Sequence, residues 1–312
     1  MHWKLKARIQ NLISLLPTSA SYATYYWMQR HFGGLRRIDP IDRLSAGIET
    51  WKRIRKHGRD PSGRVFLEIG TGRVPLAPMA YWLMGANGTI TYDLNPYLKD
   101  ELIRESLQYI SDNTEKIRAL FGSLLDSNRL DHLLALSEDR NLSTDGFLDL
   151  CRIDYVAPGD AARTELPSHS VDFHTSHTVL EHIPSEVLKR IFEEGNRIVR
   201  SQGLFVHRID YSDHFSHSDP KISAINFLQF SDEEWKAYSG NRYMYMNRLR
   251  HDDFMSIVQS AGHRVLEMEL DRDQRSQELV RTGAIKLNAR FRAKPQEILA
   301  IIGSWIVSEK SG

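Results

Sequence analysis

VFLEIGTG, residues 65–72, is an apolar run that breaks into a loop of small residues. A second apolar run, residues 89–92, is closed by the carboxylate of Asp93. In an α/β sheet this succession forms a crevice for a nucleoside, because glycines let the backbone approach the ligand and a carboxylate accepts hydrogen bonds from the ribose hydroxyls. The stretch therefore predicts a nucleoside cofactor with Asp93 on its ribose.

The loop departs from a dinucleotide-binding fingerprint in two ways. The third glycine, which lets the next helix pack under a pyrophosphate, is replaced by residues within Arg73-Val74-Pro75, and the acidic Glu68 stands two residues before the first glycine. Both features disfavour NAD and FAD. The Glu-x-Gly-x-Gly pattern resembles the first motif of class I S-adenosylmethionine-dependent methyltransferases, whose cofactor has an ammonium and a sulfonium but no pyrophosphate.

Further motifs of that family follow in the expected order. They are GDAA at 159–162, Leu166-Pro167, SVDF at 170–173 and SHTVLEHI at 176–183. The series is similar to the acidic adenine-edge loop, fourth strand and following helix of the small-molecule enzymes of methyltransferase type 11. The resemblance covers residues 62–210 well and the rest more loosely. It implies S-adenosyl-L-methionine as cofactor and an α/β, Rossmann-like fold: a seven-stranded, mostly parallel sheet with helices on both faces.

The same resemblance implies roles for individual residues. The methionine end of the cofactor is surrounded by Glu68, Gly70, Thr71 and Gly72, the ribose is held by Asp93, and Leu94 lies beside the adenine. Asp160 accepts from the adenine amino group, and the Ala161 backbone N–H meets a ring nitrogen. Ser176 and His177 line the floor between cofactor and acceptor.

Composition limits the class of protein. A chain of 312 residues with 41% hydrophobic content can bury a sizeable core, as one large domain or two small ones. A net charge of +1 provides no field for a polyanion, so we expect no nucleic-acid partner. The single cysteine, Cys151, excludes an intrachain disulfide, and we expect it in a buried strand. No apolar run is long enough to span a bilayer, and we expect a cytoplasmic protein.

The chain reads as strands that alternate with helices, which indicates a parallel sheet. We predict a methyltransferase domain over 61–312, with insertions at about 97–150, containing two helices, and 211–262. The second insertion is polar and aromatic, opens at the carboxyl edge of the sheet and is our preferred acceptor region. The expected strands are 64–69, 89–93, 151–156, 171–175, 203–209, 264–270 and 303–309.

Residues 1–60 are predicted to be an N-terminal helical cap over the cofactor crevice. Leu5, Ile9, Leu12 and Leu16 follow a helical period. A second interpretation remains open: Lys4, Lys6 and Arg8 flank this apolar face, so residues 1–16 could instead rest on anionic lipid as a peripheral contact, at the inner face of the membrane.

Three residues are our candidates for catalysis: His177, His214 and Asp210. A hydroxyl acceptor must lose its proton during attack, and an Asp–His pair after the fifth strand suits that task. His182 is expected only to tie a helix start to the sheet. Residues 210–219 also offer Asp and His oxygens and nitrogens to a metal, but such clusters are common in solvated loops, and we expect no metal.

We therefore expect a methyltransferase that acts on oxygen in a carbohydrate or other polar small molecule, in surface-polysaccharide or secondary-metabolite biosynthesis. Trp and Tyr rings suit sugar faces, and the polar side chains of 207–250 suit hydroxyls. N- or C-methylation of a lipid-like or aromatic metabolite is an alternative. A catalytically silent partner protein that only binds the cofactor is another. The oligomeric state is not indicated.

Overall fold

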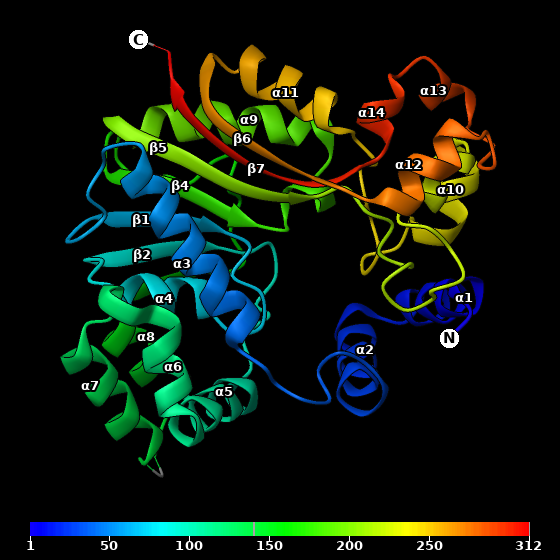
Figure 1. Ribbon diagram of the computed structural model, residues 1–312. Coiled ribbons are helices and arrows are strands. Elements are labelled where there is room, and N and C mark those ends of the chain that lie inside the picture. The colour runs from blue at the N-terminus through cyan, green and yellow to red at the C-terminus, as the bar shows by residue number, and fades with distance from the viewer. Residues whose placement is uncertain (140, 312) are drawn as a thin grey trace.

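The computed structural model describes residues 1–139 and 141–311 and contains one seven-stranded sheet (Figure 1). Its order is β3-β2-β1-β4-β5-β7-β6. The strands are β1 (Val65–Ile69), β2 (Gly88–Tyr92), β3 (Ile153–Val156), β4 (Val171–His177), β5 (Val199–Asp210), β6 (His263–Arg272) and β7 (Ile301–Lys310). All seven predicted strands are present, which confirms the sheet expected from the sequence.

The first five strands pair in parallel, and β7 runs antiparallel between β5 and β6. The order reverses at β1, because β2 lies on one side of it and β4 on the other. Ligands of open α/β sheets bind outside the carboxyl ends of the strands at such a switch point. The VFLEIGTG loop leaves β1 at this position.

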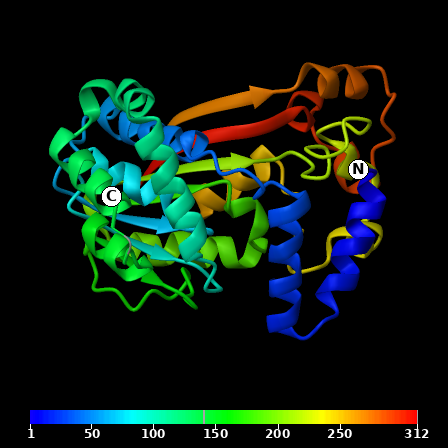
Figure 2. The ribbon, with the colours of Figure 1, turned by 90° about the horizontal axis from the view of Figure 1, so that it is seen from below.

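Helices cover both faces of the sheet and bury two separate hydrophobic cores (Figures 1 and 2). One core lies under α3 (Ile41–Lys56) and α4 (Leu76–Leu83), where Trp51 stacks on Phe66 of β1. The other lies under α9 (Ser185–Ile198) and α11 (His251–Ser260). The two cores follow from the alternation of strand side chains: Phe66 faces one core and Leu67 the other.

The segment between β2 and β3 holds four helices instead of the predicted two. They are α5 (Asp100–Asp112), α6 (Thr114–Phe121), α7 (Ser127–Ser137) and α8 (Thr144–Cys151), with a 3-10 turn at Gly122–Leu124. Short helices with separate starts explain the error: Asp126 and Ser143 each cap a helix N-terminus and interrupt the periodicity. The prediction for Cys151 was also wrong, because this buried residue ends α8 and the strand begins two residues later.

A third, smaller core lies beside the carboxyl ends of β4 and β5 and is built from distant parts of the chain (Figure 2). We call this part the small body. It contains α1 (Trp3–Ser14), α10 (Asp232–Ser239), α12 (Gln274–Arg281), α13 (Ala289–Arg292) and α14 (Gln296–Leu299), with a 3-10 turn at Asn226–Gln229. Helix α2 (Thr18–Phe32) connects it to the sheet side.

Two predicted boundaries change as a result. Helix α3 packs in a sheet core through Leu44, Ile48 and Trp51, so the cap predicted for 1–60 consists only of α1 and α2. The insertion predicted for 211–262 ends before α11, because Phe254 and Val258 of that helix belong to the second sheet core. A further elaboration, 273–300 between β6 and β7, had no counterpart in the sequence analysis.

Candidate cofactor and acceptor site

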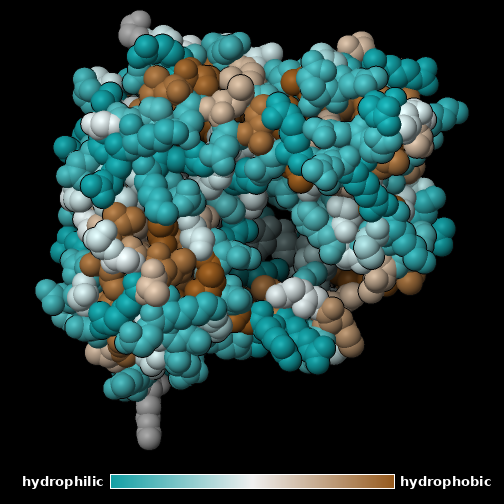
Figure 3. Space-filling model, viewed as in Figure 1, coloured by the Kyte–Doolittle hydropathy of each residue, from teal (hydrophilic) through white to brown (hydrophobic). Residues whose placement is uncertain are grey.

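The loop after β1 presents bare backbone to a cavity of about 590 Å³. Gly70 has φ +80°, and an added Cβ would lie 2.4 Å from Cγ2 of Val179, so only glycine fits there. Gly72 has φ +73°, and an added Cβ would meet no atom within 4 Å. The backbone at Gly72 is therefore open to a ligand. Figure 3 shows the surface hollowed near its centre, between the sheet layers and the small body.

Asp93 lies at the end of β2 and lines both this cavity and a second one of about 710 Å³. The Gly72 N–H donates to Asp93 Oδ2 over 2.9 Å. Burial raises the pKa of Asp93 to about 7, and the Gly72 N–H and Thr71 hydroxyl offset only part of that rise. A ligand with two hydroxyl donors would stabilise the ionised form, which fits the predicted ribose contact.

The second cavity has the features expected of an adenine site. Leu94, Asp160 and Ala161 line it together with Tyr22 of α2. Asp160 Oδ1 accepts from the Ala162 N–H over 2.9 Å, which holds the loop and leaves Oδ2 for another donor. Three of the predicted cofactor residues therefore meet at one wall of this cavity.

The first cavity has the features expected of the methionine end. Glu68, Thr71 and Gly72 line it. Burial raises the pKa of Glu68 to about 7 despite hydrogen bonds from Thr175 and Tyr81. A ligand ammonium near this carboxylate would keep it ionised.

His177 lines the first cavity, and its orientation is set by Arg43 of α3. The guanidinium donates to His177 Nδ1 over 2.8 Å and to its carbonyl oxygen over 3.0 Å. Since arginine can only donate, Nδ1 must accept, and the imidazole proton is on Nε2. Desolvation and the positive charges of Arg43 and Arg208 lower the pKa of His177 to about 3. This imidazole is a neutral donor toward the cavity and is poorly suited to be a base.

Three predicted site residues, Ser176, Asp210 and His214, line neither cavity. Ser176 is 2% exposed and lines neither cavity; its hydroxyl lies 2.8 Å from Nδ1 of His207 on β5. The prediction for Ser176 was wrong because neighbouring residues of a strand point to opposite faces. His177 points to the α3 side, whereas Ser176 points to the α9 side, where His207 and Phe192 pack.

Acidic and histidine side chains gather where β4 and β5 end. His214 Nε2 lies 3.3 Å from Asp210 Oδ2, so the predicted Asp–His pair is brought together. Burial raises the pKa of Asp210, but His214 and Ser212 outweigh it and lower the pKa to about 2. Glu181 and His182, from the 3-10 turn Leu180–His182, join the pair.

Of the remaining candidates of residues 210–219, His217 stacks on His214 with ring centroids 5.1 Å apart, whereas Asp213 and Asp219 turn away from this cluster. Asp213 accepts from the Asn226 side chain and the Phe215 N–H, and Asp219 accepts from the Trp3 N–H. Both carboxylates stabilise the small body. His182 does not tie a helix to the sheet as expected: its Nδ1 lies 2.7 Å from the Tyr245 carbonyl oxygen, so it contacts the long loop after β5.

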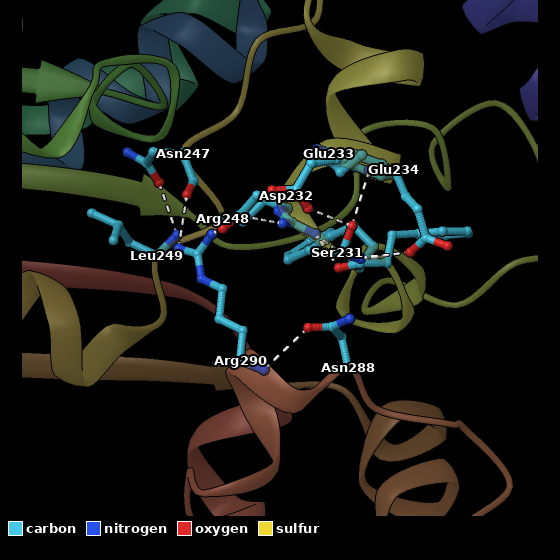
Figure 4. A network of polar contacts seen from close by, with 12 residues as sticks. Ser231, Asp232, Glu233, Glu234, Asn247, Arg248, Leu249, Asn288 and Arg290 are labelled. Atoms are coloured by element: carbon cyan, nitrogen blue, oxygen red, sulfur yellow. Dashed lines mark hydrogen bonds and ion pairs between the residues drawn. The ribbon is translucent and has the colours of Figure 1, made fainter.

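Buried arginines hold that long loop in place, and Figure 4 shows the surroundings of one of them, Arg248. Arg248, 3% exposed, donates to the carbonyl oxygens of Phe227 and Phe230 and to Asp232, which also pairs with Arg290. Arg250, fully buried, donates to the carbonyl oxygens of Tyr211, Leu299 and Ile301. These guanidiniums donate to carbonyl groups that lie in irregular backbone.

The sequence analysis missed three members of the site. Arg43 lies in a helix far from any motif, and no pattern marked it. Glu181 and His182 stood inside the quoted SHTVLEHI stretch, but their proximity to His214 depends on the pairing of β4 with β5.

A family model and several solved structures are similar to parts or most of this chain. A family model described as a methyltransferase domain matches residues 133–207, which include GDAA and SHTVLEHI. A search of curated proteins finds no match. One similar solved structure is a proposed sarcosine dimethylglycine methyltransferase from Galdieria sulphuraria, with 14% identity over 88% of this chain and 91% of that chain and a TM-score of 0.46.

Two further structures show a similar degree of likeness. An S-adenosylmethionine-dependent methyltransferase from Mesorhizobium loti has 11% identity over 86% of this chain and 100% of that chain, with a TM-score of 0.45. One from Methanosarcina mazei has 12% identity over 82% and 96% of the respective chains, with a TM-score of 0.44.

The strand order, the loop after β1 and the methyltransferase-domain match over residues 133–207 are similar to those of class I S-adenosylmethionine-dependent methyltransferases. The residues present fit that cofactor. Glu68 and the loop 70–72 would hold its methionine end, Asp93 its ribose, and the wall formed by Leu94, Asp160 and Ala161 its adenine.

Proposed function

We propose that the protein methylates a hydroxyl oxygen of a carbohydrate or comparable polar small molecule. The observation that carries this proposal is the contact between His214 and Asp210 at the carboxyl end of β5. An amine needs no base beyond solvent once it is neutral, whereas a hydroxyl must lose its proton as it attacks. A half-buried Asp–His pair near the cofactor cavity suits the second task.

The cofactor supplies an electrophilic methyl group on a sulfonium. The protein has to hold the acceptor oxygen in line with it and to accept a proton. In this proposal the acceptor O–H proton passes to the His214 imidazole as the O–C bond forms and the S–C bond breaks. Asp210, ionised because its pKa is about 2, then stabilises the imidazolium.

The second cavity, of about 710 Å³, is larger than the adenine assigned to it, and the rest of its lining supports a polar acceptor with flat faces. Tyr22, Tyr243 and Tyr245 line it, and so does Arg242, whose guanidinium lies 5.5 Å from the Tyr22 ring centroid. Aromatic rings stack on sugar faces, and the guanidinium donates to hydroxyls or to an acidic group. The site therefore favours a sugar or a similarly hydroxylated metabolite over a purely apolar one.

The test is a panel of acceptors with methyl-labelled S-adenosylmethionine. Nucleotide sugars and glycans form one arm, and amines, phenols and lipid-like metabolites form the other. We expect label in the first arm. His214→Ala should then lower kcat by about 10²–10⁴-fold, and His132→Ala, on the exposed face of α7, is the matched control.

Other results would favour the alternatives. Label only in amines or phenols would replace the proposal by N- or C-methylation. Cofactor binding in calorimetry with no label in either arm, nor in a cell extract, would indicate a catalytically silent partner protein.

We further propose that α1 rests on an anionic membrane surface. No helix among the described residues is long and apolar enough to cross a membrane, but Leu5, Leu12 and Leu15 are 52%, 67% and 80% exposed. Lys4 and Arg8 are exposed on the same helix. Apolar side chains flanked by cations are the chemistry that binds acidic headgroups at an interface. Lys6 does not contribute, because it hydrogen-bonds Ser218.

Vesicle flotation tests this contact. The protein should float with vesicles that contain phosphatidylglycerol and remain at the bottom with neutral ones. Leu12→Glu should abolish flotation, whereas Met268→Glu, at a similarly exposed apolar residue of β6, should not. Equal flotation of both variants would overturn the proposal.

A further inference from the structure

Three buried polar atoms in one small cluster have no hydrogen-bond partner. They are both carboxylate oxygens of Glu181 and Nε2 of His214. Glu181 is 2% exposed, and no lysine or arginine of the described part of the chain forms an ion pair with it. Unpaired buried polar groups are rare and costly, so a cluster of three requires an explanation.

The cluster has the donor set of a metal site. One ligand atom each of Glu181, His182 and His214 lies within 4.8 Å of the other two. Asp210 Oδ2 lies 3.3 Å from His214 Nε2, but the two groups are not aligned for a hydrogen bond. Two imidazoles with one or two carboxylates are a set that first-row divalent transition metals take.

The environment of His182 is already that of a ligand. Its Nδ1 lies 2.7 Å from the Tyr245 carbonyl oxygen, which can only accept, so the proton is on Nδ1 and the Nε2 lone pair is free. Ligating histidines are commonly oriented by such a second hydrogen bond.

We propose that Glu181, His182 and His214 bind one divalent transition-metal ion, such as Zn²⁺, with Asp210 beside it as a fourth donor. The ligand set differs from the residues 210–219 considered in the sequence, of which only Asp210 and His214 take part. The expectation of no metal is revised accordingly.

The position of this metal site suggests that the ion takes part in methyl transfer, a role that rests on the proposed function. His182 also lines the second cavity, so an ion there faces the space for the acceptor. Its open coordination position would hold an acceptor oxygen and lower the pKa of the bound hydroxyl. With the ion in place His214 would be a ligand and not the base, so the metal-bound hydroxyl would lose its proton to solvent.

Metal binding is measured on the full-length, untagged protein after treatment with a chelator and removal of the chelator. Zn²⁺ and Co²⁺ are titrated separately by calorimetry, and Co²⁺ also by its visible absorption, which reports the coordination. We expect one ion per chain. Glu181→Gln and His182→Ala should each weaken binding by more than about tenfold, and His132→Ala should bind like the parent.

The outcomes separate this proposal from the proposed function. Absence of saturable binding, or equal binding by Glu181→Gln and the parent, overturns the metal site even if methyl transfer to hydroxyls proceeds in chelator. Binding of one ion that both variants lose supports the site even if no acceptor is methylated. Binding of S-adenosylhomocysteine by each variant shows that it is folded, and Glu181→Gln serves if His182→Ala fails to fold.

Discussion

Carboxylates at the ends of neighbouring strands differ in protonation because their surroundings differ. The pKa of Asp210 is about 2, because His214 and Ser212 outweigh burial, whereas burial raises the pKa of Glu181 well above its usual range. Titratable groups with such divergent environments mark functional sites in proteins. Here they lie together beside the cavity assigned to the acceptor.

Cofactor affinity should increase with pH across neutrality. Without ligand, the pKa of Asp93 is raised to about 7, and ribose hydroxyls that donate to the carboxylate should lower it. Binding therefore releases a proton. The Kd of S-adenosylhomocysteine should be higher at pH 6 than at pH 8, by up to about tenfold per pH unit for each carboxyl group that must lose a proton. Calorimetry across this pH range measures the slope of log Kd against pH.

Substitutions assign that slope to a residue. Asp93→Asn should flatten it, and Glu68, whose pKa is also about 7, should account for what remains. Asp160→Asn, at an exposed residue, should weaken binding without changing the slope. An unchanged slope in Asp93→Asn would contradict the assignment.

Glu181→Gln should stabilise the metal-free protein. The raised pKa of Glu181 means that its ionisation costs folding free energy, a cost absent below the unfolded pKa and increasing as pH rises above it. The gain should be about 1–3 kcal/mol near pH 8 and vanish near pH 4. Urea unfolding at both pH values measures it, and a loss of stability at pH 8 would contradict the account.

At the scale of elements, the loop after β5 is ordered without regular secondary structure along most of its length. Between the end of β5 and the start of α11 it contains only a 3-10 turn and α10. Arg248 and Arg250 supply the donors that a sheet or helix would otherwise provide. Tyr245, which contacts His182, is three residues from Arg248, so this anchoring also positions the cluster.

Arg248→Ala should lower the free energy of unfolding by about 2–4 kcal/mol, because it leaves the carbonyl oxygen of Phe230 without a donor and removes one of the two donors to the carbonyl oxygen of Phe227. Arg290→Ala is the matched control, since Arg290 pairs with the same Asp232 at the surface and should cost less than about 1 kcal/mol. Equal losses in denaturant unfolding would show that the surface ion pairs, not the buried carbonyl contacts, hold the loop.

At the scale of the molecule, the N-terminus and the middle of the chain form one packing unit. Trp3 is 4% exposed, and its ring contacts those of Phe215, Phe230, Trp235 and Tyr238. Its backbone N–H donates to Asp219. Helix α1 thus packs against the core of the small body, while the face of the helix that carries Leu5 and Leu12 is exposed.

Trp3→Ala should destabilise the small body by about 3–5 kcal/mol, because it leaves a large cavity among aromatic rings. Cofactor binding should change by less than about twofold, since no residue of α1 lines either cavity. Thermal unfolding and calorimetry measure the two effects, with Trp27→Ala, at a 52% exposed tryptophan, as control. A large loss of cofactor affinity would contradict this separation of the two parts.

Prediction from the sequence succeeded where the signal is local. Each strand showed as a short apolar run, and the loop after β1 showed as glycines whose positive φ angles side chains disfavour. Prediction failed where the outcome depends on the face a residue presents. Ser176 lies one residue from His177 yet on the opposite side of β4. In α1 the buried face carries Trp3 and Ala7 and is not the face of Leu5 and Leu12 that the helical period marked.

The sequence by itself determined the sheet, the bare loop and the acid at 93, because strand alternation and glycine conformation act over a few residues. Only the tertiary structure decided that Arg43 orients His177 and that Glu181, His182 and His214 converge. Those contacts join segments 134 and about 30 residues apart. Their proximity follows from the packing of α3 and from the parallel pairing of β4 with β5, which no local pattern encodes.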